Sequence, residues 1–140
     1  MSVFVSGQIG EKARIREVFS DLVAEGWRIT HDWTTTDDLG KVLESGDEAS
    51  RRAAADITGV LDADVYLLVS DNKAAGKGMY VELGAALAMA ESRGAPDVYI
   101  VGPMNHASIF YLHPLVRHLP DVAAVVKDVQ DRRNLKAAES

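Results

Sequence analysis

Short runs of consecutive apolar residues alternate along the chain with longer stretches in which apolar residues recur every three or four positions. The continuous runs predict buried strands at 2–6, 64–70 and 97–103. Apolar and polar residues alternate over 27–33, which predicts another strand. A weaker apolar run predicts a last strand at 122–126.

Helical spacing is clearest in 11–26, where an apolar stripe ends at Gly26. Further helices are predicted at 48–63, 79–94 and 127–139. Four residues of the helix at 48–63 are expected to face inward: Ala53, Ile57, Val60 and Leu61. The remaining long segments read as loops, with a short helix in the second: 34–48 and 106–120.

Strands that alternate with helices predict a parallel sheet covered on both faces. We therefore expect a single α/β domain over residues 1–140, doubly wound and flavodoxin/Rossmann-like, with five parallel strands in the order 2-1-3-4-5. Ligands of such sheets bind beyond the carboxyl ends of the strands. The loops at that edge are predicted at 6–10, 32–47, 70–80 and 102–108.

Composition narrows the possible functions. Apolar residues make up 47% of the chain and charged residues 26%, as in soluble globular proteins, and the net charge is −6. An acidic chain is a poor binder of nucleic-acid polymers or anionic membranes. The chain has no cysteine, which excludes thiolate catalysis, and the spacing of its histidines fits no metal motif. With neither a signal-peptide pattern nor a membrane-length apolar run, we expect a cytoplasmic protein.

Glu82 is the first candidate for chemistry. It follows Gly76 and Gly78 at the predicted start of a helix, where a carboxylate interacts well with the helix dipole. One interpretation is a helix-starting residue and nothing more. The other is a nucleophile kept ionised by the helix terminus, with glycines that let a ligand approach the backbone.

Three aspartates are weaker candidates. By helical spacing Asp56 shares a side with Arg52 and Gly59 rather than with Ile57, so the pattern alone favours an exposed helix acid. Asp64 opens a strand and is typical of a cap or turn residue. Asp32 ends a strand beside an aromatic residue, as in the wall of a sugar or base pocket.

The turn "SGQIG" over residues 6–10 lies between the first strand and the first helix. A turn of small residues at this position can direct N–H groups toward an anion. It matches neither G-x-G-x-x-G nor the P-loop. No serine lies in a G-x-S-x-G elbow, which argues against a serine hydrolase.

Taken in order, "VFVSGQIG", "THDWT", "DITGVLDADVYLLVSD", "GKGMYVELGAALA" and "VYIVGP" resemble the nucleoside 2-deoxyribosyltransferase family and its relatives, the nucleoside 5′-monophosphate N-glycosidases. The resemblance covers residues 3 to about 115, and its most specific part is the D-x7-AD-strand-G-x-G-x3-E-L-G string. "GMYVE" is also similar, more weakly, to the GT-x-x-E turn of cytokinin-activating phosphoribohydrolases.

The resemblance implies a Rossmann-like enzyme that cleaves N-glycosidic bonds without a cofactor or metal. It implies that Glu82 is the nucleophile at the anomeric carbon and that Asp56 protonates the leaving base or positions the sugar. It also implies a homodimer or larger oligomer, for which the apolar segment 109–116 offers a surface. Together with the residue patterns above, the resemblance leads us to predict these substrate-binding residues: Ser6, Gly7, Gln8, Ile9, Asp32, Trp33, Gly76, Gly78 and Ser108.

Three functions remain open at this point. The first is a transferase that moves a (deoxy)ribosyl group from one base to another. The second is a hydrolase specific for nucleoside 5′-monophosphates. The third is a nucleotide-binding or sensing module on the same fold without turnover, since fold does not imply activity.

Overall fold

The computed structural model describes residues 1–35, 39–70, 77–104 and 108–139. Its centre is a five-stranded sheet in the order β2-β1-β3-β4-β5, in which every neighbouring pair is parallel. The predicted fold class and strand order are thereby confirmed. The strands are β1 (Ser2–Ser6), β2 (Arg28–Ile29), β3 (Val65–Val69), β4 (Asp97–Val101) and β5 (Val116–Leu119).

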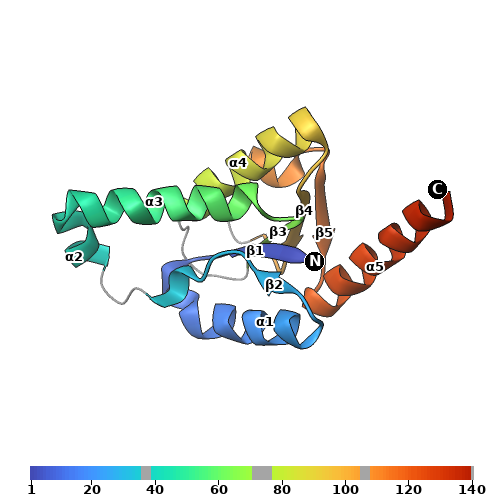
Figure 1. Cartoon of the computed structure of the whole chain (residues 1–140), viewed down its shortest axis with the longest axis horizontal. Coiled ribbons are helices and arrows are strands. Elements are labelled where there is room, and N and C mark those ends of the chain that lie inside the picture. Colours follow the sequence, from blue (N-terminus) through green and yellow to red (C-terminus); the bar gives the residue numbers. More distant parts are fainter. Residues whose placement is uncertain (36–38, 71–76, 105–107, 140) are drawn as a thin grey trace.

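Helices cover both faces of the sheet (Figure 1). The α-helices are α1 (Lys12–Ala24), α2 (Leu39–Glu44), α3 (Gly46–Leu61), α4 (Lys77–Arg93) and α5 (Val122–Glu139). Short 3₁₀ helices occur at η1 (Ile9–Glu11), η2 (Trp33–Thr35) and η3 (Ile109–Leu112). Helices α1 and α5 lie on one face and α3 and α4 on the other. Within the described ranges, no helix combines the length and apolarity needed to cross a bilayer.

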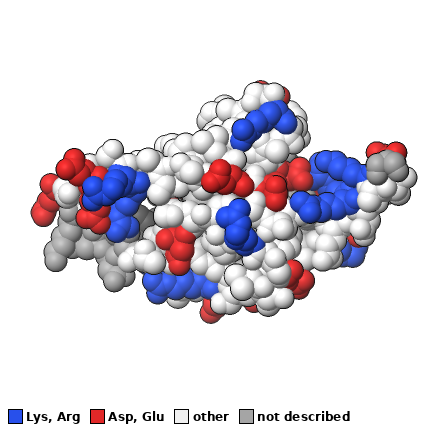
Figure 2. Space-filling view, viewed as in Figure 1, with Lys and Arg blue, Asp and Glu red and all other residues white. Residues whose placement is uncertain are grey.

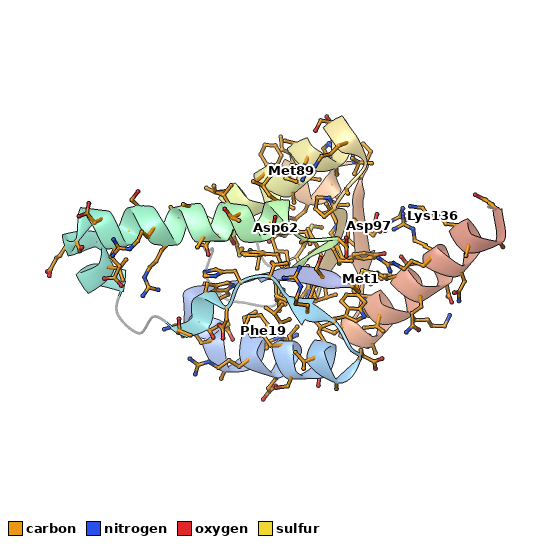
Figure 3. All side chains as sticks on the ribbon, viewed as in Figure 1. Met1, Phe19, Asp62, Met89, Asp97 and Lys136 are labelled. Atoms are coloured by element: carbon orange, nitrogen blue, oxygen red, sulfur yellow. The ribbon has the colours of Figure 1, made fainter. Side chains whose placement is uncertain are left out.

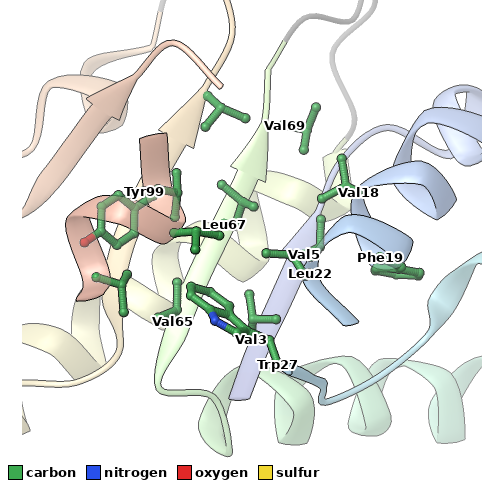
Figure 4. Close-up of a cluster of buried hydrophobic side chains, with 14 of the residues drawn as sticks. Val3, Val5, Val18, Phe19, Leu22, Trp27, Val65, Leu67, Val69 and Tyr99 are labelled. Atoms are coloured by element: carbon green, nitrogen blue, oxygen red, sulfur yellow. The ribbon is translucent and has the colours of Figure 1, made fainter. Parts of the chain in front are cut away.

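Alternate side chains of the central strands enter two separate cores. Val3 and Val5 point toward α1 and α5, in the cluster that Figure 4 shows. Phe4 and Tyr66 point toward α3 and α4, where their rings stack with centroids 6.1 Å apart. Because both faces are covered, β1 and β3 are buried along their whole length, which explains their continuous apolar sequences.

The carboxyl-terminal part of the chain differs from the prediction. The expected strand at 122–126 is the first turn of α5, and the fifth strand lies earlier, at Val116–Leu119. Asp121 caps the helix, because its Oδ1 accepts a hydrogen bond of 2.8 Å from the backbone N–H of Ala124. The apolar run is in fact one side of a helix, since Val125, Val126 and Val129 are buried together.

The second strand and the loop after it also differ. The strand predicted at 27–33 is only two residues long, and the chain then turns into η2. The segment predicted as a loop at 34–48 contains α2 and the start of α3. Ser45 caps α3 by accepting a hydrogen bond from the N–H of Glu48, a signal that a search for apolar periodicity does not use.

Candidate functional site

Glu82 lies in the second turn of α4, not in the first turn as predicted, because the helix begins at Lys77. The helix dipole therefore contributes less to its ionisation than the sequence implied, since that effect falls off within the first turn. Its side chain is only 9% exposed. The hydroxyl of Ser6, at the carboxyl end of β1, donates a hydrogen bond of 2.8 Å to Oε1 of Glu82.

Asp56 faces Glu82 from α3, and the two carboxyl groups are hydrogen-bonded to each other. The sequence pattern alone favoured an exposed acid, whereas the Asp56 side chain is only 30% exposed. The reason is the orientation of α3. Its Gly59 is buried against Phe4 of the sheet, whereas Leu61, which was expected to face inward, is 43% exposed. The residue without a side chain lets the helix approach β1 closely on the side that carries Asp56.

The protonation of this carboxyl pair is strongly perturbed. The pKa of Glu82 is raised to about 8, chiefly by burial; the Ser6 hydroxyl opposes this shift, and the charge and hydrogen bond of Asp56 add to it. Burial also raises the pKa of Asp56, against the opposing effects of His31, Glu82 and Arg52. At neutral pH Glu82 is therefore largely neutral, and the two carboxyl groups titrate together as a pair.

The turn after β1 has an evident structural role. Gly7 packs against α1, and a Cβ atom at this position would lie 2.7 Å from Cδ1 of Ile15. Gln8 is half-buried and extended, and Ile9 begins η1. Ser6, the first residue of this turn, contacts the carboxyl pair through its hydrogen bond to Glu82.

Asp32 does not join the carboxyl pair through any contact of the described residues. It is exposed, and its Oδ1 accepts hydrogen bonds from the N–H, at 2.8 Å, and the hydroxyl of Thr34, so it holds the turn into η2. The neighbouring Trp33 is oriented by its ring N–H, which donates a bond of 2.7 Å to the carbonyl of Val5. Trp33 thus lies at the carboxyl end of β1 and packs against both cores.

The remaining predicted binding residues are Gly76, Gly78 and Ser108. Gly76 lies outside the described residues. Gly78 is in the first turn of α4, with open space where a side chain would be. Ser108 caps η3 by accepting a hydrogen bond of 3.3 Å from the N–H of Phe110. Asp64 is a turn residue as predicted, since its carboxylate accepts bonds from the N–H and hydroxyl of Ser2.

Two residues near the carboxyl pair were not identified as site residues from the sequence. Nε2 of His31 lies 3.4 Å from Oδ1 of Asp56. Tyr66 is fully buried, and its hydroxyl donates a bond of 3.2 Å to the carbonyl of Met79 in the first turn of α4. Burial and the charge of Glu82 raise the pKa of Tyr66, and Ser6 opposes this shift. The position of His31 near the end of a predicted strand is the one sequence signal for its presence at the site. The sequence around Tyr66 is that of an ordinary core residue.

A hollow of about 460 Å³ lies at the opposite edge of the sheet from the carboxyl pair, where the strands begin. Asp97 and Lys136, both labelled in Figure 3, are among the residues that line it. Figure 2 shows basic side chains over α5 beside acidic ones. Arg132 lies 3.2 Å from Asp97 and Arg133 lies 3.9 Å from Asp64. These ion pairs join α5 to the sheet, so the charged residues that line the hollow have a structural role. Among the described residues, no three His, Asp or Glu side chains converge as metal ligands.

Comparison with known proteins supports the fold. No protein-family model matches the chain. A search of curated proteins gives no significant match. Among solved structures, the chain is similar to the CMP N-glycosidase BcmB of Clostridium botulinum, with 20% sequence identity and a TM-score of 0.57. The similarity covers 86% of this chain and 89% of that chain, and shows that the two proteins share a fold.

Proposed function

We propose that the protein cleaves the N-glycosidic bond of (deoxy)nucleosides or their 5′-monophosphates through a glycosyl–enzyme intermediate on Glu82, with transfer of the sugar to another base or to water. The observation that carries this proposal is the contact between Glu82 and Asp56, two carboxyl groups with raised pKa values. An oxocarbenium-like transition state requires a carboxylate to trap the anomeric carbon and an acid to assist the leaving group. A pair that shares one proton meets both requirements.

The shared hydrogen bond also gives the proton a route. In the free protein Glu82 holds its proton more tightly than a free carboxyl group, and transfer along this bond leaves Glu82 ionised and Asp56 protonated. Glu82 then forms a bond to C1′ while the C1′–N bond breaks. The departing base keeps the electron pair and takes the proton of Asp56. In the second step water or another base attacks C1′, gives its proton to Asp56 and releases Glu82.

The substrate class is supported by the sequence resemblance and by the fold shared with a CMP N-glycosidase. A small nucleoside or nucleotide enters at the carboxyl ends of the strands, where Ser6, Gly7 and Trp33 lie. The mechanism requires no metal or cofactor. We further propose a cytoplasmic homo-oligomer.

The proposal is tested by chromatography of free bases. The protein is incubated with a panel of nucleosides and 5′-monophosphates, CMP and dCMP included, with and without a second base. We expect the wild-type protein to release base and Glu82→Ala to lose this activity by a factor of about 10³ or more. Exchange of bases without net hydrolysis identifies a transferase, and release independent of an acceptor identifies a hydrolase.

A matched control is Glu91→Ala, which removes an exposed carboxylate from the same helix. It should leave base release unchanged. If no panel member loses its base although nucleotides bind to both the wild-type protein and Glu82→Ala, the enzyme proposal is wrong and a nucleotide-sensing module takes its place.

A further inference from the structure

One carboxyl oxygen of Asp56 lacks a hydrogen-bond donor among the described residues. Its Oδ1 is buried and forms no hydrogen bond within the described part of the chain. Nε2 of His31 lies 3.4 Å from this oxygen, within ion-pair distance, and both side chains are 30% exposed. A buried carboxylate oxygen without a donor is costly, so a small approach of the imidazole would satisfy it.

Two contacts with Gly59 of α3 hold the segment around His31 in place. The residue before it, Thr30, donates a hydrogen bond of 2.8 Å from its hydroxyl to the carbonyl of Gly59. A Cβ atom at Gly59 would lie 3.0 Å from Cβ of His31, so the two segments are already in close contact. Gly59 follows Asp56 by three residues on the same side of α3. The end of β2 is therefore docked on α3 directly beside Asp56.

We propose that His31 is a positioning residue for Asp56, whose imidazole N–H is donated to Oδ1 and stabilises the carboxylate that forms when Asp56 gives its proton to the leaving base. This inference rests on the proposed function. It leaves the proton balance unchanged: Asp56 loses a proton to the base in the first step and regains one from the acceptor in the second. His31 donates a hydrogen bond throughout and transfers no proton.

The charges around Asp56 agree with this role. Among the described residues, Glu82 of α4 and Arg52 of its own helix are the other ionisable groups that act on it. His31 lowers the pKa of Asp56 against the effect of burial, which strengthens Asp56 as an acid. Removal of the imidazole should therefore raise the pKa of Asp56 and leave its Oδ1 without the group that orients the carboxyl toward the leaving base.

The test uses three variants of the full chain. His31→Ala removes the donor, and His31→Gln keeps an N–H near the position of Nε2 but cannot carry a charge. The control is His113→Ala, because His113 also contacts a carboxylate, Glu91, at 2.8 Å, on the exposed side of α4. The measurements are kcat and KM for base release across pH, and the titration of the Asp56 carboxyl carbon by NMR.

We expect His31→Ala to lower kcat about 10-fold or more with little change in KM. The acid limb of its pH profile should move to higher pH, together with the titration of Asp56. His31→Gln should recover part of kcat. Because it is the more conservative change, it also tests the role of His31 if His31→Ala does not fold. A His31→Gln or His31→Ala protein with the rate and pH profile of His113→Ala overturns the inference while the proposed function stands. If the wild-type protein releases no base, the proposed function fails first, and the inference falls with it.

Discussion

At the scale of single residues, the burial of the Glu82 carboxyl group destabilises the folded protein at high pH. Its pKa rises from an ordinary 4.5 to about 8 in the folded protein, so the folded chain binds more protons than the unfolded chain between these pH values. Stability must then fall as the pH rises through this window. Glu82→Gln removes the buried charge and retains partners for Ser6 and Asp56. We expect it to stabilise the protein by about 1–3 kcal/mol at pH 9 and to have little effect near pH 4.

Thermal unfolding at the two pH values measures this difference. Glu17→Gln, on the exposed side of α1, is the control and should show no such pH dependence. An equal Tm for Glu82→Gln and the wild-type protein at pH 9 would mean that the carboxyl group is not held neutral by its surroundings.

The sequence identified part of the candidate site. Ser6, Asp56 and Glu82 were each selected, and the structure places them in contact. Asp32 was selected by the same reasoning, yet its carboxylate is occupied by its own turn. Local capture of a carboxylate by backbone N–H groups depends on dihedral angles that apolar periodicity does not report.

At the scale of elements, the contact between α3 and the sheet depends on Gly59. A Cβ atom there would lie 2.9 Å from Cδ2 of Phe4 and 3.0 Å from Cβ of His31. We expect Gly59→Ala to lower the free energy of unfolding by about 1–3 kcal/mol, because α3 must move away from β1. Since Asp56 moves with the helix, base release should fall as well.

The matched control is Gly84→Ala in α4, where no atom lies within 4 Å of the added Cβ. There the substitution should stabilise by about 0.5–1 kcal/mol, since alanine is the better helix former. Denaturant unfolding of both variants gives the comparison. A stabilising Gly59→Ala would show that the close approach of α3 is not required.

Element prediction was most accurate where burial is complete. Strands β1, β3 and β4 were identified correctly because strands covered on both faces are continuously apolar. The edge strand β5 was missed because its middle residues, Arg117 and His118, are exposed and polar. The valines of α5 were misread as a strand because a short apolar run fits either structure.

At the scale of the whole molecule, one apolar surface has no partner within the described chain. Around the buried Tyr111, η3 exposes Ile109 by 79%, Phe110 by 54% and Leu112 by 71%. Neighbouring large apolar side chains at this exposure are typical of an interface between proteins. The segment 109–116 was expected to serve a homo-oligomer, and this stays a prediction, which the exposure of these side chains gives a reason to test.

We therefore expect a dimer or larger assembly in light scattering coupled to size-exclusion chromatography, and expect Leu112→Asp to shift it toward the monomer. A charge at this position would be buried without a partner in the assembly, which costs several kcal/mol. Leu135→Asp is the control, because Leu135 is a leucine of similar exposure, 65%, on α5. A wild-type monomer, or equal behaviour of the two variants, would mean that η3 is not the interface. Circular dichroism of each variant separates a loss of assembly from a loss of folding.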